Sequence, residues 1–291
     1  MQIAFSTVAC PSWPLDRVFA VAEELGYDGV DLRTFGENSS RFAGDPFMTG
    51  TEKTRMMAAD AGVVPAVIST GLSFDTGIFP PIVGRAIRDN DKQVRAARRA
   101  VRLGAELSAP LVRVFGFELQ GGESFKSGLR RIAPRLRLVG AAARNTPAVV
   151  VVENGGSFAT SEQLGELLDA VDHPKVRAAY SPAVAIDAGE DPIDGLNAIA
   201  GIVDLVKLKD VDDHGRPVLL GEGNARCQDV VRHLADRVYR GWISVEWDLA
   251  WFEGLREAEQ VLPEAIRRVY AWRSDAGPGV PTDATTAAAS V

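Results

Sequence analysis

Three charged residues at the ends of apolar segments have side chains that could act together on a substrate. Glu153 follows four consecutive valines, Lys207 lies in segment 204–209, and Glu246 lies in segment 242–247. A carboxylate can remove a proton from carbon or from a hydroxyl group, and an ammonium can stabilise the oxyanion that results. We therefore predict proton-transfer chemistry with Glu153 or Glu246 as the base and Lys207 as the electrostatic partner. A Schiff base through Lys207 is a further alternative, although two nearby carboxylates would raise the pKa of its amine.

Short β-branched segments alternate eight times with longer amphipathic segments in this sequence. The β-branched segments predict strands at 2–6, 29–33, 64–69, 111–115, 148–153, 176–180, 204–209 and 242–247. The amphipathic segments predict helices near 14–25, 51–61, 87–104, 126–145, 160–170, 192–200, 225–239 and 254–272.

This alternation predicts an α/β fold, a (β/α)8 TIM barrel in a single domain. Near-continuous apolar strands suit a parallel sheet that is buried on both faces. A doubly wound open sheet is the alternative. We place the barrel at residues 1–273 and a low-complexity C-terminal tail, predicted to be disordered, at 274–291. Two long loops, 34–50 and 70–86, are expected to shape a substrate pocket.

Strand parity brings the three charged residues to one place. Side chains alternate between the two faces of a strand, so charged residues that end apolar strands should point into the barrel mouth rather than towards the covering helices. The strands that carry Glu153, Lys207 and Glu246 lie on one side of such a barrel. We therefore expect the three side chains to converge.

Composition limits the partners and the location. The chain has 32 basic and 39 acidic residues, a net charge of −7, so nucleic acid is not an expected partner. Its 2 cysteines support neither a disulfide framework nor a cysteine metal site. The N-terminus lacks a signal peptide pattern, and no apolar stretch approaches the roughly 18 residues of a membrane helix. We expect a cytoplasmic protein that binds a small-molecule substrate and does not associate with membranes.

Short motifs add a family resemblance over about residues 1–272. They are the opening segment 5–33, Leu111-Val112-Arg113-Val114-Phe115, Val152-Glu153-Asn154, Val206-Lys207-Leu208-Lys209-Asp210, Leu220-Gly221-Glu222-Gly223-Asn224 and Ile243-Ser244-Val245-Glu246-Trp247. In this order they resemble the sugar phosphate isomerase/epimerase family, the xylose isomerase-like barrels, which also include the endonuclease IV type of DNA repair enzyme. Barrels of that family often pair, so the resemblance is compatible with a homodimer.

The resemblance implies a divalent metal held by a Glu, an Asp, a His and a second Glu. The two glutamates fall on Glu153 and Glu246, but the Asp position holds Ser181 and the His position holds Lys207. An ammonium repels a divalent cation, so we hypothesise that Lys207 takes the place of the metal between the two carboxylates. No cofactor is therefore expected. The alternative is Mn, Mg, Co or Zn bound at Glu153 and Glu246.

Five further residues are predicted to bind substrate. The planar guanidinium of Arg113 suits a carboxylate or phosphate, although an interior salt bridge would explain it as well. Asn154 is suited to substrate hydroxyls or to capping a loop, and Trp247 to a pocket wall or to the core. Lys209, on the same strand face as Lys207, and Ser181 complete the set.

The leading function is therefore an isomerase, epimerase or related lyase that acts on a small sugar-like or carbonyl substrate by proton abstraction. The alternative is a catalytically retired barrel that binds a ligand or a partner protein, with its pocket closed by salt bridges. Paired carboxylates would also serve a glycosidase. With only 3 histidines in the sequence, a multi-zinc repair nuclease is disfavoured.

Overall fold

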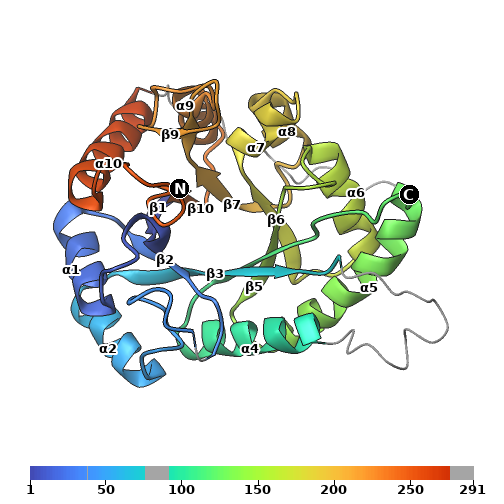
Figure 1. Ribbon diagram of the computed structural model, residues 1–291, viewed down its shortest axis with the longest axis horizontal. Coiled ribbons are helices and arrows are strands. Elements are labelled where there is room, and N and C mark those ends of the chain that lie inside the picture. The colour runs from blue at the N-terminus through green and yellow to red at the C-terminus, as the bar shows by residue number, and fades with distance from the viewer. Residues whose placement is uncertain (38, 76–91, 276–291) are drawn as a thin grey trace, which may run out of the picture.

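Eight parallel strands form a closed barrel in the computed structural model, which describes residues 1–37, 39–75 and 92–275 (Figure 1). Their order around the barrel is β1-β10-β7-β6-β5-β4-β3-β2, so β1 pairs with β10 and closes the sheet. The strands are β1 (Gln2–Ser6), β2 (Gly29–Arg33), β3 (Val64–Ser73), β4 (Leu111–Phe115), β5 (Val149–Glu153), β6 (Val176–Tyr180), β7 (Val203–Leu208) and β10 (Trp242–Val245). The predicted single-domain (β/α)8 barrel is confirmed.

Helices surround the barrel and cover the outer face of its strands (Figure 1). They are α1 (Leu15–Leu25), α2 (Thr51–Asp60), α4 (Lys92–Glu106), α5 (Phe125–Ala143), α6 (Ser161–Val171), α7 (Pro182–Asp187), α8 (Pro192–Ala198), α9 (Cys227–Asp236) and α10 (Ala258–Ser274). Figure 1 looks onto the carboxyl ends of the strands, because successive right-handed βα units run anticlockwise in this view. None of the helices in the described part of the chain is long and apolar enough to cross a membrane.

The predicted elements differ from the structure mainly at their ends and in three short additions. The additions are the 3-10 helix η1 (Thr7–Ala9), helix α7, and a small hairpin made by β8 (Asp210–Val211) and β9 (Pro217–Val218). These pieces are too short to show a hydrophobic period. Residues 87–91 of one predicted helix, 76–86 of a predicted loop and 276–291 of the predicted tail lie outside the described residues.

The barrel interior is apolar at the amino ends of the strands. Its buried side chains there belong to Ala4, Ala66, Val67, Leu111, Val151, Ala179, Leu205 and Trp242. The large ring of Trp242 fits because its neighbour across the interior is Gly29, where an added Cβ would lie 2.7 Å from the ring. This apolar floor leaves the carboxyl ends of the same strands for polar side chains.

Substitution of Gly29 tests this packing. Gly29→Ala should lower the free energy of unfolding by about 1–3 kcal/mol, because the added methyl group overlaps the Trp242 ring and the Val64 carbonyl oxygen. Gly165→Ala is the matched control, since Gly165 lies inside α6 with open space at its Cβ position. That variant should gain about 0.5–1 kcal/mol. Urea unfolding measures both, and equal stability of Gly29→Ala and wild type would contradict the packing.

Candidate active site

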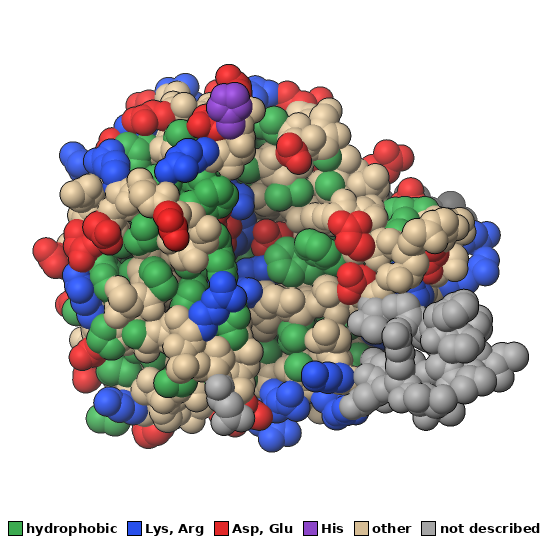
Figure 2. Space-filling view, in the orientation of Figure 1, with side chains coloured by type: hydrophobic (Ala, Val, Ile, Leu, Met, Phe, Trp, Pro, Cys, Tyr) green, Lys and Arg blue, Asp and Glu red, His purple; other side chains and the backbone are tan. Residues whose placement is uncertain are grey.

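Charged side chains fill the carboxyl-end half of the barrel interior. Figure 2 shows a hollow near the centre of this face, in which acidic and basic side chains lie together. Four basic and four acidic side chains contribute to this cluster: Arg33, Arg113, Lys207 and Lys209, and Asp31, Glu153, Glu246 and Asp248. The formal charges of these eight residues therefore cancel. We call this set the charged cluster.

Lys207 is the buried centre of the charged cluster. Its side chain is 0% exposed, and its Nζ atom lies 2.5 Å from Asp31 Oδ2 and 3.1 Å from Glu246 Oε1. The Lys207 Nζ atom also donates to Ser244 Oγ at 3.4 Å, and Ser244 Oγ in turn donates to Asp31 Oδ2 at 2.7 Å. Lys207 thus donates hydrogen bonds to Asp31 and Ser244 and forms an ion pair with Glu246.

The surroundings keep Lys207 protonated. Burial lowers the pKa of its amine, but Asp31 and Glu246 outweigh burial and raise that pKa above the ordinary value. An amine that stays charged is a poor nucleophile. These contacts therefore argue against the Schiff base considered from the sequence, and they make Lys207 a fixed positive charge.

Asp31 is the member of this group that sequence reasoning missed. It lies in the middle of β2, is fully buried, and reaches across the inner face of β1 and β10 to the Lys207 ammonium on β7. A carboxylate in the middle of the apolar segment Gly29–Arg33 was the available signal, since a buried acid needs a partner. The hypothesis that Lys207 lies between Glu153 and Glu246 needs correction, because its second carboxylate partner is Asp31.

Glu153 instead pairs with Arg113 on the neighbouring strand. The Arg113 Nε and Glu153 Oε2 atoms are 3.3 Å apart, and both side chains are buried. The contact is an ion pair without hydrogen-bond geometry, so Glu153 Oε2 has no hydrogen-bond partner among the described residues. Arg113 also contacts Ser69 Oγ at 3.4 Å and stacks on the Phe115 ring. Its interior salt bridge is thus present, and its predicted role in binding substrate stays a prediction.

The two glutamates have different proton affinities. Burial raises the pKa of Glu153, Arg113 lowers it in part, and the charge of Glu246 raises it again. Burial also favours the neutral form of Glu246, but Lys207 and Lys209 outweigh it and lower the pKa of Glu246 to about 2. Two carboxyls whose pKa values are pushed apart are suited to different roles. Glu153 is the better base, and Glu246 remains a carboxylate.

Lys209 is the most accessible lysine of the charged cluster. Its side chain is 27% exposed, and its Nζ atom is 3.3 Å from Asp248 Oδ2. Burial lowers the pKa of this amine, whereas Glu246 and Asp248 raise it above the ordinary value. Lys209 thus presents a positive charge that a substrate can reach.

Asn154, Ser181 and Trp247 lie beside the charged cluster with mostly structural contacts. The Asn154 side chain donates to the Ala159 and Ser181 carbonyl oxygens and accepts from the Ser181 backbone N–H at 2.6 Å. The Trp247 indole donates to the Arg256 carbonyl oxygen at 2.9 Å. The Ser181 Oγ atom is buried and has no hydrogen-bond partner among the described residues. Ser181 is 0% exposed, so its predicted role in binding substrate stays a prediction.

The donor set does not suit a divalent metal. Of the four positions that correspond to the metal ligands implied by the family resemblance, only Glu153 and Glu246 are carboxylates. Arg113 already pairs with Glu153, and Lys207 pairs with Glu246. The Lys207 ammonium occupies the His position, where it would repel a divalent cation. Among the described residues, no group of three or more His, Cys, Asp or Glu side chains is placed to hold a metal ion.

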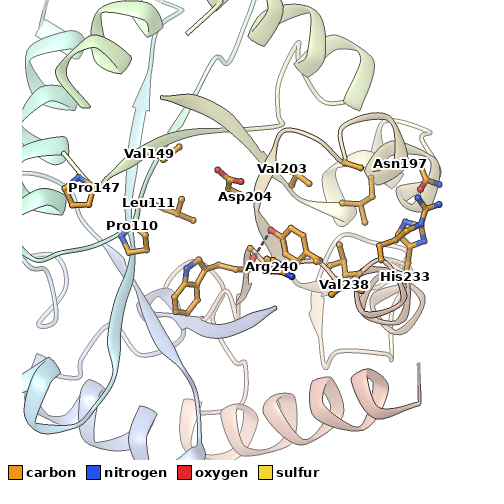
Figure 3. A pocket seen from close by; sticks show the side chains of 17 residues that line it. Pro110, Leu111, Pro147, Val149, Asn197, Val203, Asp204, His233, Val238 and Arg240 are labelled. Atoms are coloured by element: carbon orange, nitrogen blue, oxygen red, sulfur yellow. Dashed lines mark hydrogen bonds between the residues drawn. The ribbon is translucent and has the colours of Figure 1, made fainter. Parts of the chain in front are cut away.

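A second hollow, of about 480 Å³, lies at the opposite end of the barrel (Figure 3). The first residues of β4, β5, β7 and β10 line it, together with α8 and α9. Its acidic lining residue, Asp204, is 2.5 Å from Arg177 in an ion pair. Barrel active sites lie at the carboxyl ends of the strands, so we assign no catalysis to this hollow.

Comparisons with known proteins agree with the architecture. The model of the xylose isomerase-like TIM barrel family matches residues 19–272, so the chain belongs to that family. No curated protein sequence matches the chain.

Solved structures share the fold at low sequence identity. An L-ribulose 3-epimerase superposes with a TM-score of 0.76 at 16% identity, covering 94% of this chain and 94% of its own. A probable 3-DHS dehydratase involved in petrobactin synthesis from Bacillus anthracis gives 0.74 at 16% identity, covering 93% of this chain and 99% of its own. D-psicose 3-epimerase from Clostridium cellulolyticum H10 gives 0.70 at 13% identity, covering 94% and 99%.

Removal of the Lys207 charge should destabilise the protein in a pH-dependent way. At pH 7, Lys207→Met leaves two buried carboxylates unpaired and should cost about 3–5 kcal/mol. The low pKa of Glu246, about 2 against an ordinary 4.5, stabilises the wild type above pH 4.5, and this contribution is lost as the pH falls towards 2. The variant lacks the part of that contribution that comes from Lys207, and protonation relieves the carboxylates left without it. Its deficit should therefore shrink on acidification.

Urea unfolding at pH 7 and pH 4 measures this deficit. Lys175→Met is the matched control, because Lys175 Nζ donates to the Thr146 and Ala148 carbonyl oxygens and not to a carboxylate. Its smaller loss should not depend on pH in this range. A Lys207→Met deficit that is equal at both pH values would contradict the ion-pair account.

Proposed function

We propose that this protein is an isomerase of a small sugar-like or carbonyl substrate, or a related epimerase or lyase, that works without a divalent metal. The observation that carries the proposal is the pair of buried glutamates whose pKa values diverge, Glu153 above and Glu246 below the ordinary value. The similarity to an L-ribulose 3-epimerase and a probable 3-DHS dehydratase supports this reaction class.

Glu153 is the proposed base. It removes the proton from the carbon next to the substrate carbonyl, the C–H electron pair forms the carbon–carbon double bond, and the carbonyl oxygen becomes an oxyanion. The protonated Glu153 then gives a proton to the former carbonyl carbon, and the adjacent hydroxyl proton moves to the oxyanion, which completes an isomerisation with one base. While it holds the proton, Glu153 can exchange it with solvent. Epimerisation or dehydration needs a second proton donor.

Lys209 and Arg113 are the proposed oxyanion partners. Lys209 is partly exposed and holds one carboxylate at 3.3 Å, which leaves N–H donors for a substrate oxygen. Fixed cations in a site of restricted water stabilise developing negative charge strongly.

Lys207 has a different proposed part. Its side chain is 0% exposed and contacts Asp31, Ser244 and Glu246 within the barrel, so it does not contact substrate. It supplies the positive charge that keeps Glu246 ionised beside Glu153. Lys207 is therefore a positioning residue in this proposal, and Glu153 is the catalytic residue.

A closed salt-bridge network also favours the second candidate function, a catalytically retired barrel that binds a ligand. The sealed Lys207 and the paired Arg113 and Glu153 are the features expected of such a pocket. Exchange of substrate protons with solvent distinguishes the two functions, because a retired barrel catalyses none.

Proton exchange in deuterated water tests the proposed function. A panel of ketoses, aldoses, sugar acids and sugar phosphates is incubated with the protein and EDTA, and proton NMR detects loss of the signal next to the carbonyl. We expect exchange with at least one compound, and a decrease of about 100- to 10,000-fold in Glu153→Gln. The rate should rise with pH through the pKa of Glu153, since the base must be deprotonated.

Asp204→Asn is a control for Glu153→Gln, because Asp204 is an ion-paired acid at the opposite end of the barrel. It should retain the wild-type rate. An exchange rate in Glu153→Gln equal to that of the wild type would refute the assignment of the base. Absence of exchange with the whole panel would favour the retired barrel.

A further inference from the structure

A pocket of about 620 Å³ adjoins the charged cluster on the side of β2 and β3. The ends of these strands, the loop that follows β2, and the first turns of α4 form its walls. Figure 1 shows α4 alongside β3 at the edge of the barrel. Arg33 belongs both to the charged cluster and to the wall of this pocket, which we call the Arg33 pocket.

Arg33 differs from the other three cations of the charged cluster. Arg113, Lys207 and Lys209 each have a carboxylate oxygen within 3.3 Å. Among the described residues, none places a carboxylate within ion-pair distance of Arg33. Its Nη1 atom donates to the Ser69 carbonyl oxygen at 3.3 Å, and its guanidinium lies 4.7 Å from the centre of the Phe35 ring.

In this arrangement the partly desolvated guanidinium of Arg33 lies near the positive charge of Arg113. Burial and the charge of Arg113 lower the pKa of Arg33 to about 10, and the charges of Glu246, Asp31 and Glu153 offset this only in part. An anion that binds beside this half-buried cation would stabilise its charged form. The guanidinium is planar and suited to bidentate contact with a carboxylate or phosphate.

The described residues that line the Arg33 pocket carry a net positive charge. Among the described residues, its basic lining residues are Arg33, Lys92 and Arg99, and its acidic one is Glu37, a net charge of 3 − 1 = +2 for this part of the lining. Arg99 is 3.7 Å from Glu37, which is a long ion pair between exposed side chains. This local charge is opposite to the net charge of −7 of the whole chain.

The backbone at Gly71 lies close to the guanidinium of Arg33. A Cβ atom at position 71 would lie 2.8 Å from Arg33 Nη2, so a larger residue would displace the guanidinium. The β3–β4 pairing shifts register between Ser69 and Ser73, at the point where Gly71 lines the pocket. The local backbone thus leaves room for the fork at the boundary between pocket and charged cluster.

We propose that the Arg33 pocket binds an anionic group of the substrate, a phosphate ester or a carboxylate, while the reacting carbon lies over Glu153. The proposal rests on the proposed function for the identity of the reacting end, and on Arg33, Lys92 and Arg99 for the anion. It assigns the substrate to anionic sugar-like compounds and excludes neutral sugars as the preferred class.

Anion binding tests the proposal without any need for turnover. Isothermal titration calorimetry at low ionic strength measures binding of inorganic phosphate and, separately, of malonate. We expect wild type to bind at least one of them, and Arg33→Gln to bind it at least tenfold more weakly. Arg17→Gln is the matched control, since Arg17 also stacks on an aromatic ring, Trp13, but lies on α1 outside the pocket.

The two probes separate the sources of the anion. Tighter binding of phosphate supports a phosphate ester, and tighter binding of malonate supports a carboxylic acid. Arg99→Gln, a change at an exposed wall residue, should weaken binding about threefold or more and keeps the test valid if Arg33→Gln does not fold. Binding of neither probe by wild type, or equal binding by wild type and both variants, would overturn the proposal.

The results also separate this proposal from the proposed function. Anion binding that depends on Arg33, without proton exchange in any panel compound, would leave the pocket assignment standing and remove the isomerase. Proton exchange that is equally fast with neutral and anionic compounds and unchanged in Arg33→Gln would remove the pocket assignment and keep the isomerase.

Discussion

The polar interior at the carboxyl ends of the strands depends on the ion pairs between the buried Lys207 ammonium and its two carboxylate partners, Asp31 and Glu246. An ammonium removed from water is tolerated only where close anions and hydrogen bonds compensate, and Asp31, Ser244 and Glu246 provide them. Asp31 reaches Lys207 across β1 and β10, where the inward residues are the small Ala4 and Ser244. This contact therefore joins β2 to β7 through the barrel interior.

The basic side chains of the charged cluster give its two glutamates different pKa values. Lys207 holds Glu246 in the ionised form, and the charge of Glu246 helps to raise the pKa of Glu153 on the other side of the site. A base with raised proton affinity and a permanent carboxylate thus arise from two residues of the same type. Arg33, the cation of the cluster without a carboxylate in contact, marks the side on which an anionic ligand can bind.

The fold followed from the sequence more completely than the site did. Eight alternating segments and their lengths predicted the barrel, because strand and helix periods are local properties. Parity placed Lys207 and Glu246 together, but the pairing of Glu153 with Arg113 depends on side-chain conformations that parity does not give. Asp31 and Arg33 were missed because β2 has only five residues, too few for its charged positions to form a recognisable pattern. Asn154 and Trp247 were predicted to bind substrate, yet their polar atoms contact the backbone.

The decisive measurement is the metal content of the purified protein, because we propose that the Lys207 charge takes the place of a divalent metal. Inductively coupled plasma mass spectrometry is applied to wild type and to the Lys207→His/Ser181→Asp variant, both prepared without chelator. The account predicts far less than one metal ion per chain in wild type and a gain of metal in the variant. Near-stoichiometric metal in wild type would contradict it.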